Sequence, residues 1–220
     1  MIAIVLLTYN RPEYAERTLR STLDNIHTLH DLHVHIADDG TSEEYRDNLL
    51  RLAGGYSKVK SVSVSNSNHK GYGCNYNLAT QQVHQFADCI LPLEDDWELT
   101  RSLDLDVLVQ AVNHTGIGCI RLGYMGYTQL LKCEFFSCAG YHWLLLDHNS
   151  PEPHVFSGHP RFETRDWERS VGPWPEGLEP GRTEFVVAHN KAARRGVVWP
   201  VDLVKPSGDL FVHIGTVRSY

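Results

Sequence analysis

Three adjacent carboxylates give the strongest chemical signal in this 220-residue chain. Glu94, Asp95 and Asp96 follow the apolar run Cys89–Leu93, and Trp97 comes directly after them. Carboxylates this close repel one another, and a hard divalent cation such as Mn²⁺ or Mg²⁺ relieves the repulsion because it prefers oxygen ligands. A solvated acidic turn is the alternative. The apolar neighbours favour a metal site at the end of a buried strand.

Two further polar stretches also follow apolar runs. They are Thr8-Tyr9-Asn10-Arg11 and Asp38-Asp39-Gly40-Thr41. Because Asp-Gly is a common turn dipeptide, the second stretch taken alone could be no more than a turn. After a buried strand, its carboxylates are well placed to accept hydrogen bonds from a base or a ribose.

Strand and helix patterns alternate between these stretches. Short apolar runs predict strands at Ile2–Leu7, Leu32–Ala37, Val59–Val64 and Cys89–Leu93. Helical spacing predicts helices at Glu13–Leu23, Ser42–Leu52 and Gly71–Phe86. This alternation is typical of an α/β fold with a Rossmann-like, mostly parallel sheet flanked by helices. The polar stretches should then converge at the carboxyl edge of the sheet.

Length and composition predict one domain over residues 1–220, and 42% of the residues are hydrophobic. The five cysteines are odd in number and include no CxxC pair, so we expect reduced thiols. The opening run Ile2–Leu7 is far shorter than the roughly 20 apolar residues of a spanning helix. It is also too short for a signal peptide, so we predict a cytoplasmic protein without an integral membrane segment. The net charge of −7 indicates no general attraction to polyanions.

Four motifs in order resemble glycosyltransferase family 2, whose members have the GT-A fold. They are Val5-Leu6-Leu7-Thr8-Tyr9-Asn10-Arg11, Asp38-Asp39-Gly40-Thr41, the spacing of Gly71 to Asn77 followed by Ala79, and Leu93-Glu94-Asp95-Asp96-Trp97 at the position of the family's Asp-x-Asp (DXD) motif. The chain departs from the family at Tyr76, where arginine is usual, and at Glu94, which replaces the first aspartate. The carboxy-terminal Gln-x-x-Arg-Trp motif of processive synthases is absent, which argues against processive synthesis.

The resemblance implies a metal-dependent hexosyltransferase that takes a sugar from a nucleotide-diphosphate sugar, with a UDP-sugar favoured. By this resemblance residues 1–100 form the donor half, and the donor nucleotide would contact Thr8, Tyr9, Asn10, Arg11, Asp38, Asp39, Lys70, Gly71, Asn77 and Asp95. Glu94 and Asp96 would bind Mn²⁺ or Mg²⁺. Family members often supply a late histidine to the metal, and His213 is the candidate here. An ordinary histidine at a strand end is the alternative for His213.

An inverting transferase needs a general base on the acceptor side. We expect residues 101–220 to pack onto the first sheet and to form this side. Glu184 is the first candidate base because the apolar residues Phe185–Ala188 follow it, and Glu176 is the second. We expect Gly181-Arg182-Thr183-Glu184 to lie at a loop-to-helix junction, where a helix-capping role is the alternative for Glu184. Trp167 and Trp174 are the candidates for stacking on an acceptor, with core packing as the alternative.

The acceptor itself carries no sequence signal. A surface glycan is one candidate, and a hydroxymethylated pyrimidine in phage DNA is another. Two other functions remain open at this stage: a non-catalytic nucleotide-sugar-binding domain and a sugar-phosphate nucleotidyltransferase. Nucleotidyltransferases carry a glycine-rich loop after the first strand, whereas this chain has Thr8-Tyr9-Asn10-Arg11 there.

Overall fold

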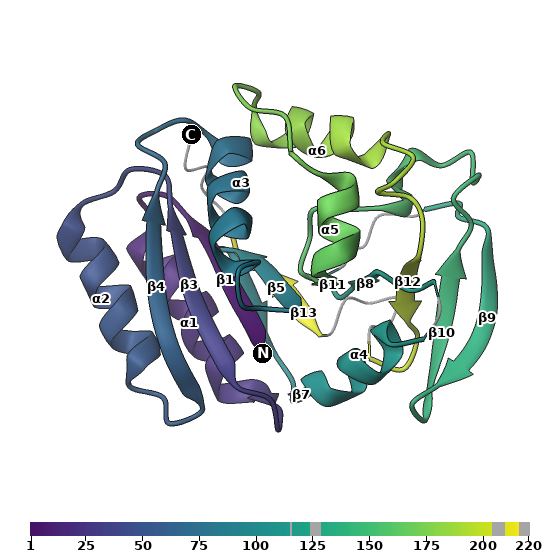
Figure 1. The fold of residues 1–220 in the computed structure, drawn as a ribbon, viewed down its shortest axis with the longest axis horizontal. Coiled ribbons are helices and arrows are strands. Elements are labelled where there is room, and N and C mark those ends of the chain that lie inside the picture. Colours follow the sequence, from purple (N-terminus) through teal and green to yellow (C-terminus); the bar gives the residue numbers. More distant parts are fainter. Residues whose placement is uncertain (115, 124–128, 204–209, 216–220) are drawn as a thin grey trace.

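The computed structural model describes residues 1–114, 116–123, 129–203 and 210–215. Its largest feature is a nine-stranded sheet, in which the four strands expected from the sequence lie side by side in the order β4-β3-β1-β5 (Figure 1). These strands are β1 (Ile2–Thr8), β3 (Leu32–Asp38), β4 (Val59–Asn66) and β5 (Cys89–Glu94). Neighbouring strands in this group are all parallel, as the alternating pattern predicted.

Three helices connect these strands: α1 (Pro12–Asn25), α2 (Glu43–Gly54) and α3 (Tyr72–Val83). Each helix begins at a local signal. Pro12 stands in the first turn of α1, where its missing N–H leaves no hydrogen bond unmade. The Ser42 side chain caps α2 by accepting a hydrogen bond from the backbone N–H of Tyr45. Gly71, with a φ of 85°, turns the chain into α3.

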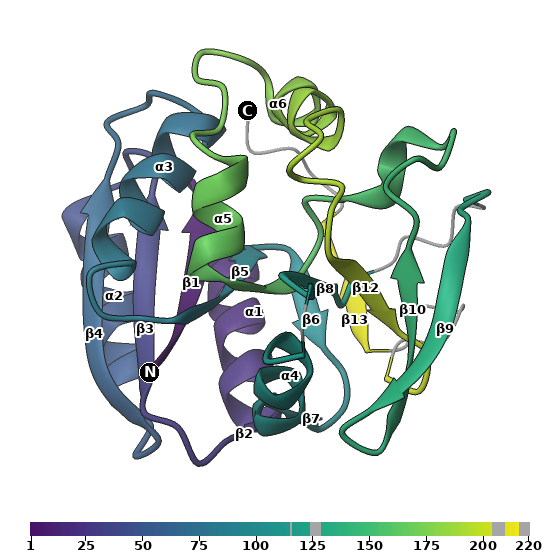
Figure 2. The same cartoon turned by 45° about the vertical axis from the view of Figure 1, so that its right-hand side comes forward.

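Strand β1 is buried on both faces of the sheet. Ile4 and Leu6 belong to the core that contains Leu19 of α1, whereas Val5 belongs to the core that contains Tyr76 of α3. Successive side chains of a strand point to opposite faces, so a strand covered on both sides must be apolar throughout. Figures 1 and 2 show α1 and α2 on one face of the sheet and α3 and α5 on the other.

The second half packs onto the first sheet, as predicted, since Trp167 and Val187 share a core with Val5 of β1, and it also extends that sheet edge to edge. The junction is β11 (Arg161–Thr164), which pairs antiparallel with β5. The sheet continues through β8 (Cys119–Arg121), β12 (Val197–Pro200), β10 (Tyr141–Leu146) and β9 (Cys133–Cys138). Pairing of this kind satisfies the backbone groups along the β5 edge, which would otherwise need other partners.

The remaining elements of the second half surround this extension. They are α4 (Leu105–Val112), a 3₁₀ turn (Pro153–Val155), α5 (Arg165–Val171) and α6 (Pro180–Ala188). Two small sheets join β2 (Ile26–His27) to β7 (Leu103–Asp104) and β6 (Trp97–Leu99) to β13 (Phe211–His213). The β6–β13 pair brings the end of the described chain back to the acidic motif.

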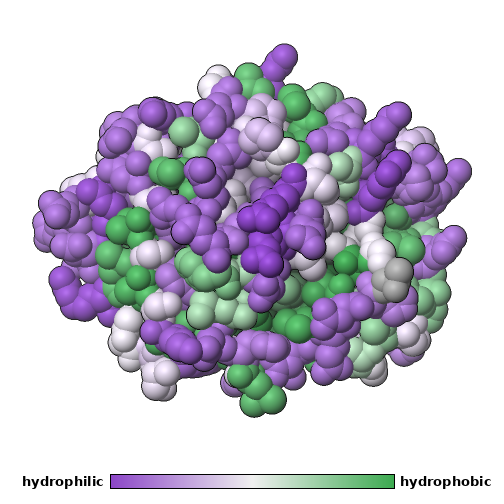
Figure 3. All heavy atoms as spheres, viewed as in Figure 1, coloured by the Kyte–Doolittle hydropathy of each residue, from purple (hydrophilic) through white to green (hydrophobic). Residues whose placement is uncertain are grey.

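The molecular surface is mixed in character. Figure 3 shows hydrophilic side chains over most of one face, with hydrophobic patches between them. Within the described residues, no helix combines the length and the apolar character that crossing a membrane requires.

Buried polar side chains join β3 to β4. Both ring nitrogens of His33 and of His35 lie 2.7 to 2.9 Å from serine hydroxyl oxygens of β4, those of Ser61, Ser63 and Ser65. Burial lowers the pKa of His35 to about 4, and the neighbouring His33 ring lowers it further. His35 is therefore neutral in the folded protein at neutral pH.

This histidine should make the fold sensitive to acid. The pKa of His35 is about 4 in the folded state against 6.5 for the free group, so the unfolded chain binds more protons between these values. The contribution of His35 to the free energy of unfolding is therefore fully present above pH 6.5. It decreases as the pH falls toward 4 and below, and the total loss is about 3 kcal/mol. Urea unfolding at several pH values measures this effect. The free energy of unfolding of His35→Gln should depend less on pH than that of the wild type. The exposed His27→Gln is the control, and parallel pH profiles for wild type and His35→Gln would contradict the assignment.

Candidate active site

The three polar stretches lie together at the carboxyl ends of β1, β3 and β5, where the sheet pattern placed them. The Thr8 hydroxyl donates a hydrogen bond of 2.8 Å to Asp95 Oδ2, and the backbone N–H of Tyr9 lies 3.4 Å from the same oxygen. The backbone N–H of Asn10 donates to the Thr41 hydroxyl at 3.0 Å. The first loop is thus tied to both acidic stretches.

Arg11 makes the strongest ionic contacts of this edge. Its guanidinium lies 3.2 Å from Asp95 Oδ1 and 2.7 Å from Asp96 Oδ2. Burial raises the pKa of Asp95 to about 7, and the charge of Arg11 opposes that rise. Arg11 was predicted to contact the donor nucleotide. The structure places its charge on the acidic motif.

His213 is brought to the acidic motif by strand pairing. It lies opposite Trp97 in the antiparallel β6–β13 pair, and the next residue, Ile214, donates its backbone N–H to the Asp96 carbonyl at 2.8 Å. The Nε2 atom of His213 is 3.3 Å from Asp96 Oδ2. The other carboxylate oxygen of Asp96, Oδ1, is buried without a hydrogen-bond partner. Asp96 Oδ2 and His213 Nε2 thus lie side by side, and Asp96 Oδ1 has no protein partner.

Glu94 is the most electrostatically perturbed acid of the motif. Burial raises its pKa to about 8, and the nearby charges of Asp96 and Glu184 raise it further. The Tyr72 hydroxyl, which is also buried, lies next to this carboxyl and favours its ionised form. Without a cation, Glu94 is therefore largely protonated at pH 7. A bound cation would favour the carboxylate.

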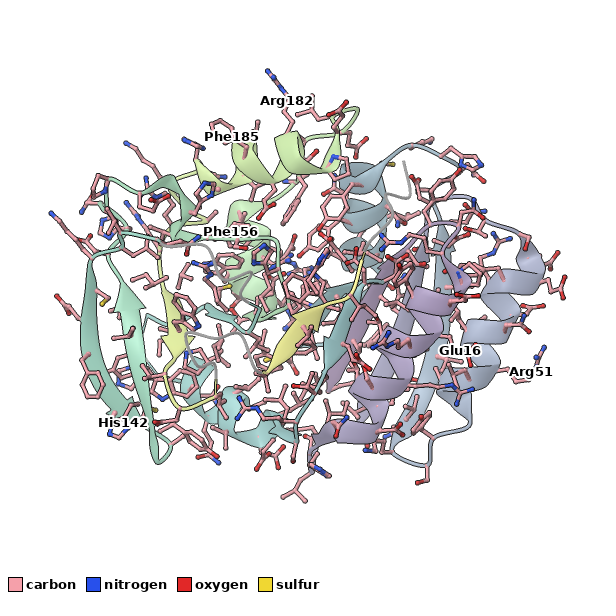
Figure 4. All side chains as sticks on the ribbon, turned by 180° about the vertical axis from the view of Figure 1, so that it is seen from behind. Glu16, Arg51, His142, Phe156, Arg182 and Phe185 are labelled. Carbon is pink, nitrogen blue, oxygen red and sulfur yellow. The ribbon has the colours of Figure 1, made fainter. Side chains whose placement is uncertain are left out.

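Glu184 approaches this motif from α6. The helix begins at Pro180, so Glu184 lies within it and not at the loop-to-helix junction that the sequence suggested. Its Oε1 accepts a hydrogen bond of 2.7 Å from the backbone N–H of Gly158. Its charge also acts on Glu94 and on His159, which places the three groups in one cluster. In Figure 4, Phe156 lies inside the molecule below α6, and Arg182 projects outward from that helix.

His159 is a member of the cluster that the sequence did not single out. Its ring lies 5.1 Å from Trp97 and the His213 ring lies 5.2 Å from the same tryptophan, measured between ring centroids. Burial lowers the pKa of His159 to about 4, although Glu184 opposes the shift. Trp97 thus stands between two imidazoles beside the acids.

The carboxylates after β3 are held by protein partners. Asp38 Oδ2 accepts hydrogen bonds from the Arg46 guanidinium and the Thr41 backbone N–H, each at 2.9 Å. Asp39 accepts from the Ser67 hydroxyl and from the backbone N–H of Gly71, at 3.2 Å to Oδ1 and 3.1 Å to Oδ2. Asp38 Oδ1 is buried without a partner. These contacts fix the loops beside the site and leave one oxygen of Asp38 available.

Several predicted site residues lie in the interface between α3 and the second half. The Asn77 side chain donates to the Trp174 carbonyl at 2.9 Å and to Glu176 Oε1 at 3.0 Å, and its Oδ1 accepts from the backbone N–H of Trp174 at 2.8 Å. Trp174 is only 2% exposed. Trp167 is also buried, and its indole N–H donates to the Arg195 carbonyl at 2.7 Å. These surroundings favour the packing alternative for both tryptophans. Lys70 is exposed next to Gly71.

Tyr76, which replaces the family's usual arginine, takes part in a buried polar network. The Tyr76 hydroxyl hydrogen-bonds to Glu163 and accepts from the Arg161 guanidinium at 2.9 Å. Arg161 also pairs with Glu163 at 2.8 Å. Arg161 is 1% exposed, so its charge is used inside the protein and does not replace the missing arginine at the donor side.

The family follows from a comparison with known protein families. The family model described as Glycosyl transferase family 2 matches residues 3–130, which is more than half of the chain. The chain belongs to glycosyl transferase family 2. Its fold is the GT-A fold, as the resemblance implied. No curated protein sequence matches it.

Several solved structures resemble this family 2 chain in fold. TarS from S. aureus, residues 1–349 with UDP, is 15% identical with a TM-score of 0.64, and the match covers 90% of this chain and 57% of that fragment. The match to a longer TarS chain covers 34% of it. GalNAc-T7 with UDP, GalNAc and Mn²⁺ is 12% identical with a TM-score of 0.66, covering 100% and 45%. The mannosyltransferase PcManGT from Pyrobaculum calidifontis, with GDP-Man and Mn²⁺, is 13% identical with a TM-score of 0.58, covering 90% and 56%. The chain thus spans roughly half of each of these three solved chains.

A divalent cation fits the donor set of this family 2 site. Asp96 offers a buried oxygen without a partner, and His213 Nε2 lies 3.3 Å from the other oxygen. Two ligands on adjacent positions of an octahedral cation have a similar separation, about 3 Å for bond lengths near 2.1 Å. The described residues contain no ready-made group of three His, Cys, Asp or Glu side chains around one point. Arg11 occupies part of this space.

Proposed function

We propose that this family 2 enzyme transfers a hexose from a UDP-sugar to an acceptor hydroxyl, with inversion and without processive synthesis. The convergence of Glu94, Asp96 and His213 with Glu184 supports this proposal. Asp96, His213 and Glu94 would form the cation-binding set, and Glu184 would be the separate carboxylate beside it. A non-catalytic binding domain has no use for the second carboxylate. A sugar-phosphate nucleotidyltransferase is disfavoured because the loop after β1 has no glycine.

The proposed roles follow from position. Asp96, His213 and Glu94 would hold Mn²⁺ or Mg²⁺, which when bound neutralises charge on the diphosphate of the donor. Glu184, held through Gly158, would accept the proton of the acceptor hydroxyl. Deprotonation at this carboxylate makes the acceptor oxygen a nucleophile while the sugar bond to the diphosphate breaks. Residues 1–100 would form the donor half and residues 101–220 the acceptor half of one domain.

The donor base is proposed from the loops and from the related structures. TarS and GalNAc-T7 were solved with UDP, whereas PcManGT was solved with GDP-Man. Thr8, Tyr9, Asp38 and Asp39 resemble the uracil-binding loops of the family. Calorimetry with UDP, GDP and dTDP, each with and without Mn²⁺, tests the proposal. With Mn²⁺ present, UDP should bind more tightly than GDP or dTDP, and without Mn²⁺ it should bind only weakly. Tighter binding of GDP than of UDP would overturn the choice of base.

The loop that Asp39 holds should affect donor binding. Asp39→Ala removes the acceptor for Ser67 and for the backbone N–H of Gly71, so the loop leading into α3 loses its anchor. We expect the UDP dissociation constant to rise by about tenfold, equivalent to about 1.4 kcal/mol. Calorimetry measures it, with Asp31→Ala as the control because Asp31 forms an exposed ion pair with Lys60. Unchanged UDP affinity in Asp39→Ala would remove this loop from the donor site.

For the acceptor we propose a hydroxyl of a glycan. A hydroxymethylated pyrimidine in DNA is the second candidate, because His148, Lys191, Arg194 and Arg195 line one pocket and bring positive charge to the second half. Transfer assays with oligosaccharides and with hydroxymethylated DNA would separate these acceptors.

A further inference from the structure

Arg11 lies where a bound cation would be expected. Its guanidinium spans Asp95 and Asp96, at 3.2 and 2.7 Å, and all three side chains are nearly buried, with 12%, 6% and 10% exposure. Asp96 Oδ2, the oxygen that receives Arg11, is also the one 3.3 Å from His213 Nε2. The contact thus uses the oxygen that lies next to the candidate nitrogen ligand.

The surrounding structure holds this arrangement in place. The Arg11 guanidinium carbon lies 4.7 Å from the ring centroid of Tyr14, and the Thr18 hydroxyl donates to the Asp95 carbonyl at 2.8 Å. Gly215 lies over the ion pair. A Cβ atom added there would lie 2.4 Å from Asp96 Oδ2 and 2.9 Å from Arg11 Nη2. Gly215 therefore packs closely over Arg11 and Asp96, and a larger residue at position 215 would displace the ion pair.

Electrostatics explains why a cation is needed here. Glu94, Asp95, Asp96 and Glu184 bring carboxyl groups into one largely buried region. Unpaired charges in such a region are costly, and a neighbouring cation lowers the cost. A guanidinium and a divalent cation repel each other at short range. They therefore cannot both occupy the space between Asp96 Oδ2 and His213 Nε2.

We propose that Arg11 is a built-in cation that holds Asp95 and Asp96 in the metal-free protein and competes with the divalent cation for Asp96. Loading of the cation then requires the guanidinium to leave Asp96, while His213 stays beside that carboxylate. The metal part of this inference rests on the proposed function. The ion pair itself does not. By linkage, any contact that favours the Arg11–Asp96 pair weakens cation binding by the same factor.

The test is Mn²⁺ binding in the absence of nucleotide. Titration followed by the electron paramagnetic resonance of free Mn²⁺ should show tighter binding to Arg11→Gln than to wild type, by about tenfold or more, within the usual range of coupling between two ligands. Arg11→Lys keeps the positive charge but has a single ammonium group for two carboxylates. Its affinity for Mn²⁺ should therefore lie between those of the wild type and Arg11→Gln. The control is Arg17→Gln on the same helix, since Arg17 is half-exposed and pairs with Glu98. It should bind Mn²⁺ as wild type does.

Each outcome decides for or against competition. Equal or weaker Mn²⁺ binding by a folded Arg11→Gln or Arg11→Lys protein would overturn it, since Arg11 would then be neutral toward the metal or would help to position its ligand. If wild type binds no Mn²⁺, a gain of binding in Arg11→Gln still supports competition, and no gain overturns it. UDP binding to wild type, measured separately by calorimetry, tests the proposed function independently. Circular dichroism shows whether each variant is folded.

Discussion

Replacement of Asp96 by alanine should abolish sugar transfer and weaken binding of the donor nucleotide. Asp96 is the acid that combines a buried oxygen without a partner with a second oxygen 3.3 Å from His213 Nε2. Its loss removes the central oxygen ligand of the proposed cation site and leaves Arg11 paired with Asp95 alone. The charge on the departing diphosphate would then be poorly neutralised. A loss of several kcal/mol of transition-state stabilisation is expected, equivalent to at least about 10³-fold in rate.

The measurement is transfer from UDP-sugar in the presence of Mn²⁺, together with UDP affinity by calorimetry. EDTA should inhibit the wild type, and added Mn²⁺ or Mg²⁺ should restore activity. Asp31→Ala, which removes an exposed acid paired with Lys60, is the control and should leave transfer unchanged. Full wild-type activity in excess chelator would disprove the metal assignment, whatever the result for Asp96→Ala.

Replacement of Glu184 by glutamine should lower kcat by about 10²–10⁴ while leaving donor binding nearly unchanged, as expected for loss of a general base. Glutamine keeps an oxygen that can still accept the hydrogen bond from the Gly158 N–H, so the contact that holds this side chain survives. The variant loses only the ability to take up a proton. Glu184 is also the acceptor-side acid whose charge acts on Glu94 and His159, which places it at the cluster.

Glu176→Gln provides the matched comparison, because Glu176 was the second candidate base. It is exposed and hydrogen-bonds to Asn77, outside the cluster. We expect near wild-type turnover for Glu176→Gln and a large loss for Glu184→Gln, with similar UDP affinity in both. If both variants keep near wild-type turnover, the base lies elsewhere or the enzyme retains configuration. The anomeric configuration of the product, determined by NMR, distinguishes these two cases.

Much of the first half could be predicted from the chain itself. The strands β1, β3, β4 and β5 and the helices between them occur within a few residues of the predicted bounds. Their local signals are strong, because continuous apolar runs indicate strands buried on both faces and Pro12 indicates a helix start. Parallel connectivity then places the polar stretches at one edge. The meeting of Thr8, Asp38 and Asp95 required no further information.

The tertiary structure decided how charges and partners are distributed within that edge. Arg11 and Asp96 are 85 residues apart, Glu184 is 26 residues from Gly158, and His213 reaches Asp96 only because β13 pairs with β6. A periodic pattern reports which face of an element is buried, but not which distant element covers it. The partners of Arg11 and the strand that pairs with β5 could therefore not be predicted from the sequence. Packing placed the Arg11 guanidinium on two buried carboxylates and joined the second half to β5 through β11, because buried charges and exposed strand edges both need partners.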